Sequence, residues 1–88
     1  MYAIICTDKD GALEIRKANR DKHLAYLGAS PIVIAGPFQD ESEAMTGSLI
    51  VLDVATRAEA EDWAANDPYA KAGLFASVEL IEWKKVVG

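Results

Sequence analysis

Short apolar runs alternate with two amphipathic stretches along the chain, and their order predicts the fold. Four runs of β-favouring residues predict strands at residues 2–7, 32–35, 47–52 and 78–86. Apolar and charged positions recur at helical spacing from Leu13 to Leu27, which predicts a first helix. A second helix is expected from Thr56, because Thr56 and Glu59 have the spacing of a capping box. The predicted order is strand, helix, strand, strand, helix, strand.

This order matches a ferredoxin-like βαββαβ fold of the α+β class, with a four-stranded antiparallel sheet and the helices on one of its faces. A sheet with one solvated face alternates apolar and polar positions. The runs Tyr2 to Cys6, Ile32 to Ala35 and Leu49 to Leu52 are instead apolar on both sets of positions. We therefore expect the second face to be covered by the same sheet of another copy, in a homodimer that packs sheet against sheet.

Composition narrows the class of protein further. A length of 88 residues fits one domain over residues 1–88. The net charge of −5 opposes binding to a phosphate backbone, and the predicted central strands lack the exposed aromatic pair of RNA-binding sheets. A single cysteine, Cys6, allows no internal disulfide, and neither a membrane-spanning apolar run nor a basic leader is present. We expect a soluble cytoplasmic protein without a nucleic-acid or membrane partner.

The chain has one histidine, His23, in the first predicted helix, and histidine is the side chain that titrates near neutral pH. At about 100° per residue, one stripe of this helix is apolar and holds Leu13, Leu24 and Leu27. Arg20 falls within that stripe, and Arg16 and His23 lie along its edge. Either Arg20 covers the core with its stem while His23 is a partly buried histidine with a satisfied hydrogen bond, or these groups form a site.

Asp67 is the second candidate, and it precedes Pro68. Aspartate before proline is a common helix N-cap with proline at the first helical position. A cap occupies one carboxylate oxygen, so the other oxygen remains free to accept a bond from an imidazole N–H and fix the ring tautomer. Capping and partnership with His23 are therefore both open.

The remaining polar and small residues are less specific. Cys6 lies in an apolar strand without an adjacent base, which favours a core position, and Trp63 and Trp83 are expected in the core or an interface. One histidine and one cysteine match no metal-ligand spacing. The pairs Gly36-Pro37 and Gly47-Ser48 have two open interpretations: they only mark turns at the strand ends, or they bring backbone amides close to a bound anion.

Several short motifs, in this order, resemble the YciI-like (YCII-related) family over essentially the whole chain. They are Arg20-x-x-His23-Leu24, Ala35-Gly36-Pro37-Phe38, Gly47-Ser48, Asn66-Asp67-Pro68-Tyr69 and Ala72-Gly73-Leu74-Phe75. The resemblance implies a dimeric ferredoxin-like fold of the dimeric α/β-barrel type. It also implies a site centred on a histidine and an aspartate, which here are His23 and Asp67.

The resemblance further implies that a pocket is bordered by Arg20, Gly36, Pro37 and Ser48. One branch of the family is similar to dehydrochlorinases of chlorinated hydroxyhydroquinones. Proton transfer by His23, oriented by Asp67 and assisted by Arg20, needs no cofactor. We therefore expect lyase or isomerase chemistry on a small aromatic or keto acid. The alternative is a non-catalytic binding or interaction module with a structural histidine–aspartate pair.

Overall fold

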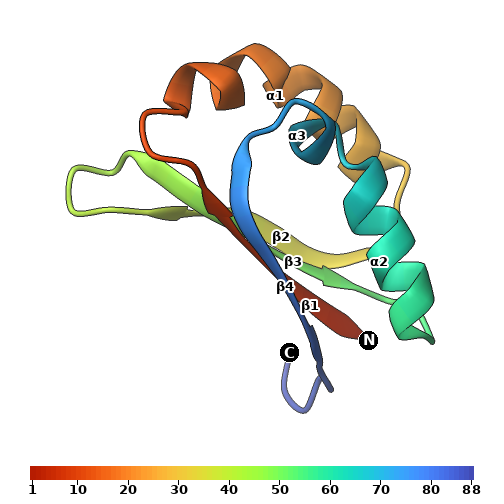
Figure 1. The fold of residues 1–88 in the computed structure, drawn as a ribbon. Helices are drawn as coiled ribbons and strands as arrows, with labels where there is room; N and C mark the ends of the chain where they lie inside the picture. The colour runs from red at the N-terminus through yellow and green to blue at the C-terminus, as the bar shows by residue number, and fades with distance from the viewer.

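Four strands and three helices form two layers in the computed structural model, which describes residues 1–88 (Figure 1). In chain order the elements are β1 (Tyr2–Asp8), α1 (Leu13–Gly28), β2 (Ile32–Gln39), β3 (Met45–Leu52), α2 (Arg57–Asn66), α3 (Pro68–Lys71) and β4 (Phe75–Glu82). The strands form one antiparallel sheet in the order β2-β3-β1-β4. The helices all lie on one face of it (Figure 1). The predicted α+β, ferredoxin-like arrangement is confirmed.

The apolar core lies between the two central strands and the helices. Within the register, Ile4 of β1 pairs with Ile50 of β3 and Leu80 of β4, so these side chains share the helix-covered face. The buried cluster consists of Ile4, Cys6, Ile50, Leu52 and Trp63. The core positions expected for Cys6 and Trp63 are confirmed. Two hydrogen bonds join α1 and its C-terminal loop to α2: Tyr26 Oη donates to the Trp63 carbonyl oxygen at 2.8 Å, and Trp63 Nε1 donates to Ser30 Oγ at 2.7 Å.

The helix starts follow the local sequence. Thr56 Oγ1 accepts a bond from the Glu59 amide at 3.2 Å, which is the cap expected for α2. Helix α2 ends at Asn66, and Asp67 separates it from α3, which begins with Pro68 at its first position. No helix is both long and apolar enough to span a membrane.

Three strand boundaries differ from the sequence-based prediction. The segment Gly36-Pro37 is part of β2, because β2 is an edge strand on which proline is tolerated, and β3 begins at Met45, two residues before the expected start at Gly47. The last strand spans Phe75–Glu82 and not 78–86. Its register explains the shift: Glu82 pairs with Tyr2 at the start of β1, so the chain beyond Trp83 has no strand to pair with.

The inward face of α1 also differs from the expected apolar stripe. Leu24 is 44% exposed, whereas Arg16 and His23 are only 3% and 6% exposed. Arg20, which was placed within the stripe, is exposed. Polar side chains of α1 are therefore buried against the sheet, which is stable only if each of them finds a partner there.

Candidate functional site

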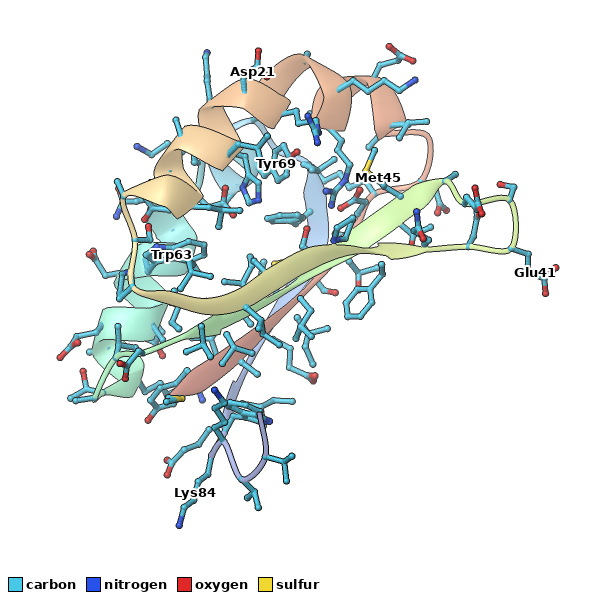
Figure 2. All side chains as sticks on the ribbon, turned by 180° about the vertical axis from the view of Figure 1, so that it is seen from behind. Asp21, Glu41, Met45, Trp63, Tyr69 and Lys84 are labelled. Carbon is cyan, nitrogen blue, oxygen red and sulfur yellow. The ribbon has the colours of Figure 1, made fainter.

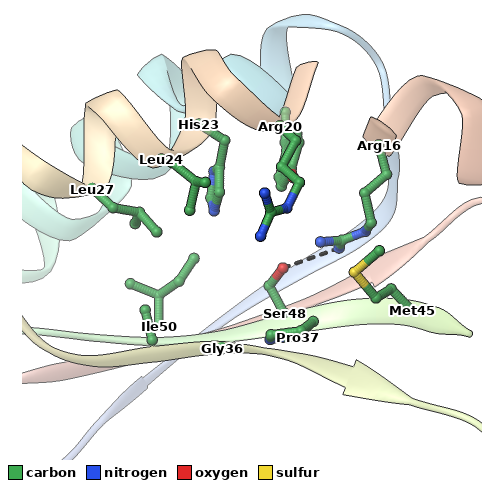
Figure 3. Close-up of a pocket in the computed structure, with 12 residues that line it drawn as sticks. Arg16, Arg20, His23, Leu24, Leu27, Gly36, Pro37, Met45, Ser48 and Ile50 are labelled. Atoms are coloured by element: carbon green, nitrogen blue, oxygen red, sulfur yellow. Dashed lines mark hydrogen bonds between the residues drawn. The ribbon is translucent and has the colours of Figure 1, made fainter. Parts of the chain in front are cut away.

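A cavity of about 160 Å³ lies between α1 and the strands β2 and β3 (Figure 3). Its lining comprises Arg16, Arg20, His23, Leu24, Leu27, Ala35, Gly36, Pro37, Met45, Ser48, Ile50 and Tyr69. Five of the six residues singled out in the sequence are in this lining, and the sixth, Asp67, lies behind His23 and bonds to it. The structure therefore brings together all six positions, which come from α1, β2, β3 and the junction between α2 and α3.

His23 and Asp67 form a buried hydrogen-bonded pair. His23 Nδ1 lies 2.8 Å from Asp67 Oδ1, and the two side chains are 7% and 2% exposed. A carboxylate oxygen can only accept, so Nδ1 carries the proton and the neutral ring keeps Nε2 free as an acceptor. The imidazole extends from α1 into the cavity (Figure 3). This arrangement is the one that general acid–base chemistry needs: one nitrogen oriented, the other available.

Asp67 is both a helix cap and the partner of His23. Its Oδ1 atom accepts the Tyr69 amide at 3.0 Å as the N-cap of α3, in addition to His23 Nδ1. The sequence suggested that the cap and the histidine would use different oxygens, whereas both bonds converge on Oδ1. The cap therefore fixes the carboxylate that in turn orients the imidazole.

Arg16 is held by a second buried network at the neighbouring end of the cavity. Its Nε and Nη2 atoms donate to the two carboxylate oxygens of Asp8 at 2.8 and 2.9 Å, and Nη2 also donates to Ser48 Oγ at 3.0 Å. Burial disfavours the charged guanidinium, but the hydrogen bond and charge of Asp8 outweigh it, so the pKa of Arg16 is raised. Asp8 balances the charge of Arg16 inside the protein.

Arg20 differs from Arg16 although both line the cavity. Its side chain is exposed, and none of the ion pairs of the chain includes it. The guanidinium of Arg20 extends from α1 toward the cavity, beside His23 (Figure 3). It is thus the cationic group of the lining that no carboxylate balances, and it is available to a ligand.

The opposite wall is formed by strand residues. Pro37 of β2 pairs with Ser48 of β3, and Gly36 pairs with Leu49. These small residues lie within strands, so the turn alternative is wrong, and Gly36, Pro37 and Ser48 line the cavity. Ser48 contributes a hydroxyl that is already bonded to Arg16.

Cys6 takes no part in this chemistry as a nucleophile. Its side chain is 2% exposed, and burial, with a smaller contribution from the charge of Asp67, raises its pKa to about 12. The thiol is therefore protonated at neutral pH. No three histidine, cysteine, aspartate or glutamate side chains lie close enough together to hold a metal ion.

Sequence reasoning missed two residues and undervalued a third. Arg16 precedes His23 by seven residues, or two helical turns, and this spacing was a usable signal. Tyr69 follows Asp67 by two residues and stacks its ring on His23. Asp8 gave no signal, because only the fold brings the end of β1 beside α1.

Comparison with known proteins places this site in context. The YCII-related domain family matches residues 1–84. An uncharacterized protein of Haemophilus influenzae is 40% identical over 97% of this chain and 97% of its own length. Protein YciI of Escherichia coli O6:H1 is 33% identical over 98% of each chain.

A solved structure is similar over nearly the whole fold. It is the 5-chloro-2-hydroxyhydroquinone dehydrochlorinase TftG of Burkholderia phenoliruptrix AC1100 in complex with 2,5-dihydroxybenzoquinone. It is 34% identical, covers 96% of this chain and 94% of its own, and superimposes with a TM-score of 0.86. The relative with this fold is thus an enzyme, and its structure holds a small ring compound.

Proposed function

The chain belongs to the YCII-related family, and from this premise we propose that it is a small acid–base enzyme of lyase or isomerase type. The observation that carries the proposal is the buried His23–Asp67 pair at the wall of a cavity that also contains the unpaired guanidinium of Arg20. His23 is the general base or acid, Asp67 orients it, and Arg20 stabilises negative charge.

The cavity limits the size of the substrate. A volume of about 160 Å³ is close to that of a cavity of about 150 Å³ that holds one benzene ring. Half of the lining is apolar, with Leu24, Leu27 and Ile50 on one side of His23 and the arginines on the other (Figure 3). A single ring or a short keto acid with an acidic hydroxyl fits this combination. The relative TftG, whose structure holds 2,5-dihydroxybenzoquinone, supports the same class.

The proposed step is a proton transfer. Nε2 of His23 takes the proton of an acidic O–H or C–H group, and the bonding electron pair stays on the substrate. The resulting phenolate or enolate lies beside Arg20, whose charge no carboxylate of the chain balances. The intermediate then either regains the proton at another atom, which is an isomerisation, or expels an anionic leaving group with its electron pair, which is an elimination. No group outside the chain is required.

The second part of the proposal is a homodimer. Ile34, Val51, Ala3 and Ile81 form one register row that alternates with the core row, so they lie on the face opposite the helices. Ile34 and Ile81 are 53% and 45% exposed, and Phe38 is 40% exposed. We expect a second copy to cover this face. Sedimentation equilibrium should give twice the chain mass, and Ile34→Lys with Ile81→Lys should give a monomer.

The test of the enzymatic proposal is turnover of hydroxylated quinones, chlorinated hydroquinones and small keto acids by wild type and by His23→Gln. Glutamine keeps a polar side chain at this position but cannot exchange a proton at neutral pH. We expect kcat to fall by about 10²-fold or more while the far-UV circular dichroism spectrum stays the same. The matched control is Lys22→Gln, since Lys22 is exposed on the same helix.

Two results would contradict the proposal. Turnover that survives His23→Gln removes the histidine from the mechanism. If instead no tested compound binds or reacts, and His23→Ala lowers the free energy of unfolding by about 1 kcal/mol or more, the pair is a structural hydrogen bond of a non-catalytic module.

A further inference from the structure

The ring of Tyr69 lies flat against the imidazole of His23. The two ring centroids are 3.9 Å apart and the planes differ by 13°. Tyr69 is itself 2% exposed and belongs to the cavity lining. In the sequence this tyrosine stands out only as the residue that follows Asp67-Pro68, and the proposed acid–base step assigns it no role.

One hydrogen bond does not fix the orientation of an imidazole. A bond from Nδ1 to Asp67 sets the direction of that nitrogen, but hydrogen bonds tolerate a range of angles, so the ring can still tilt about its Cβ–Cγ bond. A parallel ring at van der Waals distance blocks this tilt on one side. The bond and the stack together determine where Nε2 points, which is what proton transfer depends on.

The tyrosine ring is held firmly enough to act in this way. It packs in a second buried cluster with Ala12 and Leu74, and its edge meets the ring of Phe75 at a centroid distance of 6.1 Å. The guanidinium carbon of Arg16 lies 4.8 Å from the centre of the tyrosine ring, and Asp8 fixes that guanidinium. Contacts from β4, from the residue before α1 and from α1 itself therefore hold Tyr69.

The two constraints on His23 come from one three-residue segment. Asp67 supplies the carboxylate, Pro68 starts α3, and the amide of Tyr69 donates to the same Oδ1 atom that His23 contacts. A displacement of this segment moves the carboxylate and the aromatic ring together, so their positions relative to each other are preserved.

We infer that Tyr69 is a positioning residue for the proposed reaction, in which its ring holds the plane of the His23 imidazole so that Nε2 faces the cavity. This inference rests on the proposed function. It assigns the role to the aromatic ring and not to the phenolic hydroxyl.

The test compares Tyr69→Leu, which removes the flat ring but keeps an apolar side chain, with Tyr69→Phe, which keeps the ring and removes only the hydroxyl. The single histidine of the chain gives one set of imidazole signals in NMR spectra. A stacked aromatic ring shifts the imidazole carbon-bound protons upfield. We expect Tyr69→Phe to retain these shifts, and Tyr69→Leu to move them to those of a free histidine.

The kinetic readout separates positioning from binding. With a substrate found in the screen above, kcat should fall about tenfold to a hundredfold in Tyr69→Leu with little change in KM. The Tyr69→Phe variant should keep a kcat close to that of the wild type. If the leucine variant does not fold, Tyr69→Met replaces it, because a flexible side chain fills the space without a planar face.

Two outcomes overturn the role of Tyr69. The first is a Tyr69→Leu or Tyr69→Met variant with the imidazole shifts and kcat of the wild type. The second is a Tyr69→Phe variant as impaired as Tyr69→Leu, which moves the role to the hydroxyl. Neither is confused with failure of the proposed function, which is diagnosed separately by turnover that survives His23→Gln.

Discussion

The two ends of the sheet are covered by helices in opposite ways. Under α2 the buried contacts are apolar, with Trp63 packed on Ile4 and Leu52. Under α1 the buried side chains are charged or polar: Arg16, His23, Ser48 and Asp67. Figure 2 shows the two regions, with Trp63 marking the apolar end and Tyr69 and Met45 marking the polar one. One small sheet thus supports two kinds of interior.

The difference shows what each end is built for. Apolar burial stabilises a fold directly, whereas buried charges lose hydration and often contribute no net stability even when paired. The polar end nevertheless leaves no buried side-chain nitrogen or oxygen without a hydrogen bond. A complete network of this kind, placed beside a cavity, fits a site held in one geometry better than it fits a requirement for stability.

The largest effect expected is at the polar end. Asp8→Ala leaves the guanidinium of Arg16, now 3% exposed, without its counter-charge. We expect urea unfolding to show a loss of about 4 kcal/mol, because an unpaired buried charge is costly. The matched control is Arg57→Ala, which breaks an ion pair whose side chains are 58% and 59% exposed and should cost less than about 1 kcal/mol.

A double replacement sharpens this first prediction. Asp8→Leu with Arg16→Met removes both charges, and the protein should recover most of the stability that Asp8→Ala loses. If the double variant is as unstable as Asp8→Ala while packing elsewhere is intact, the ion pair is itself a source of stability. The two ends would then not differ in what stabilises them.

A slightly smaller loss is expected at the apolar end. Leu52 is fully buried, and Leu52→Ala should lower the free energy of unfolding by about 3 kcal/mol through lost contacts and a new cavity. Turnover per folded molecule should not change, because Leu52 does not line the site cavity. Lost turnover in a folded Leu52→Ala protein would mean that the two ends are not separate.

The next largest loss of stability is expected at Gly47, where the backbones of β3 and β1 approach closely. A Cβ atom on Gly47 would collide with the carbonyl oxygen of Cys6, whereas one on Gly36 has no heavy atom nearby. Gly47→Ala should therefore destabilise by about 2 kcal/mol, measured by thermal and urea unfolding. Gly36→Ala is the control and should be close to neutral, and equal losses in the two variants would contradict the close approach.

The smallest effect is expected at the carboxylate of Asp40, which is exposed and belongs to neither interior. Hydrogen bonds from the Ser42 hydroxyl and amide, and from the Ala44 amide, lower the pKa of Asp40 in the β2–β3 hairpin. The folded state thus favours the ionised form, which stabilises the fold above the ordinary aspartate pKa of about 4 and is lost as the pH falls through the lowered value.

Asp40→Ala should therefore be slightly less stable than wild type near neutral pH. The gap between the two unfolding midpoints should narrow as the pH is lowered below about 4. A gap that is constant or that grows on acidification would contradict this assignment of the hairpin bonds.

The sequence predicted the apolar end better than the polar one. Periodicity and caps located the helices, because apolar spacing and the Thr56–Glu59 cap act over short distances. The end of β4 was predicted too late, since apolar residues continue past the point where β1 can pair with them. A strand boundary depends on a partner that local composition does not reveal.

The candidate residues were identified partly from chemistry and partly from family resemblance. His23 stood out as the single histidine, and Asp67 as a cap before proline, but their contact comes from residues 44 positions apart. The seven-residue spacing puts Arg16 on the same side of α1 as His23, but its burial could not be predicted from α1 alone, because a buried arginine is stable only with Asp8 opposite it. Such long-range compensation lies outside any helical periodicity.

The most direct test of the acid–base account is the protonation pattern of the His23 ring. Two-bond ¹⁵N–¹H NMR spectra at about pH 8.5, above the usual titration range of histidine, report which nitrogen carries the proton. The account predicts one tautomer with the proton on Nδ1 in the wild type, and loss of that preference in Asp67→Ala. A ring protonated on Nε2, or an even mixture of tautomers in the wild type, would contradict it.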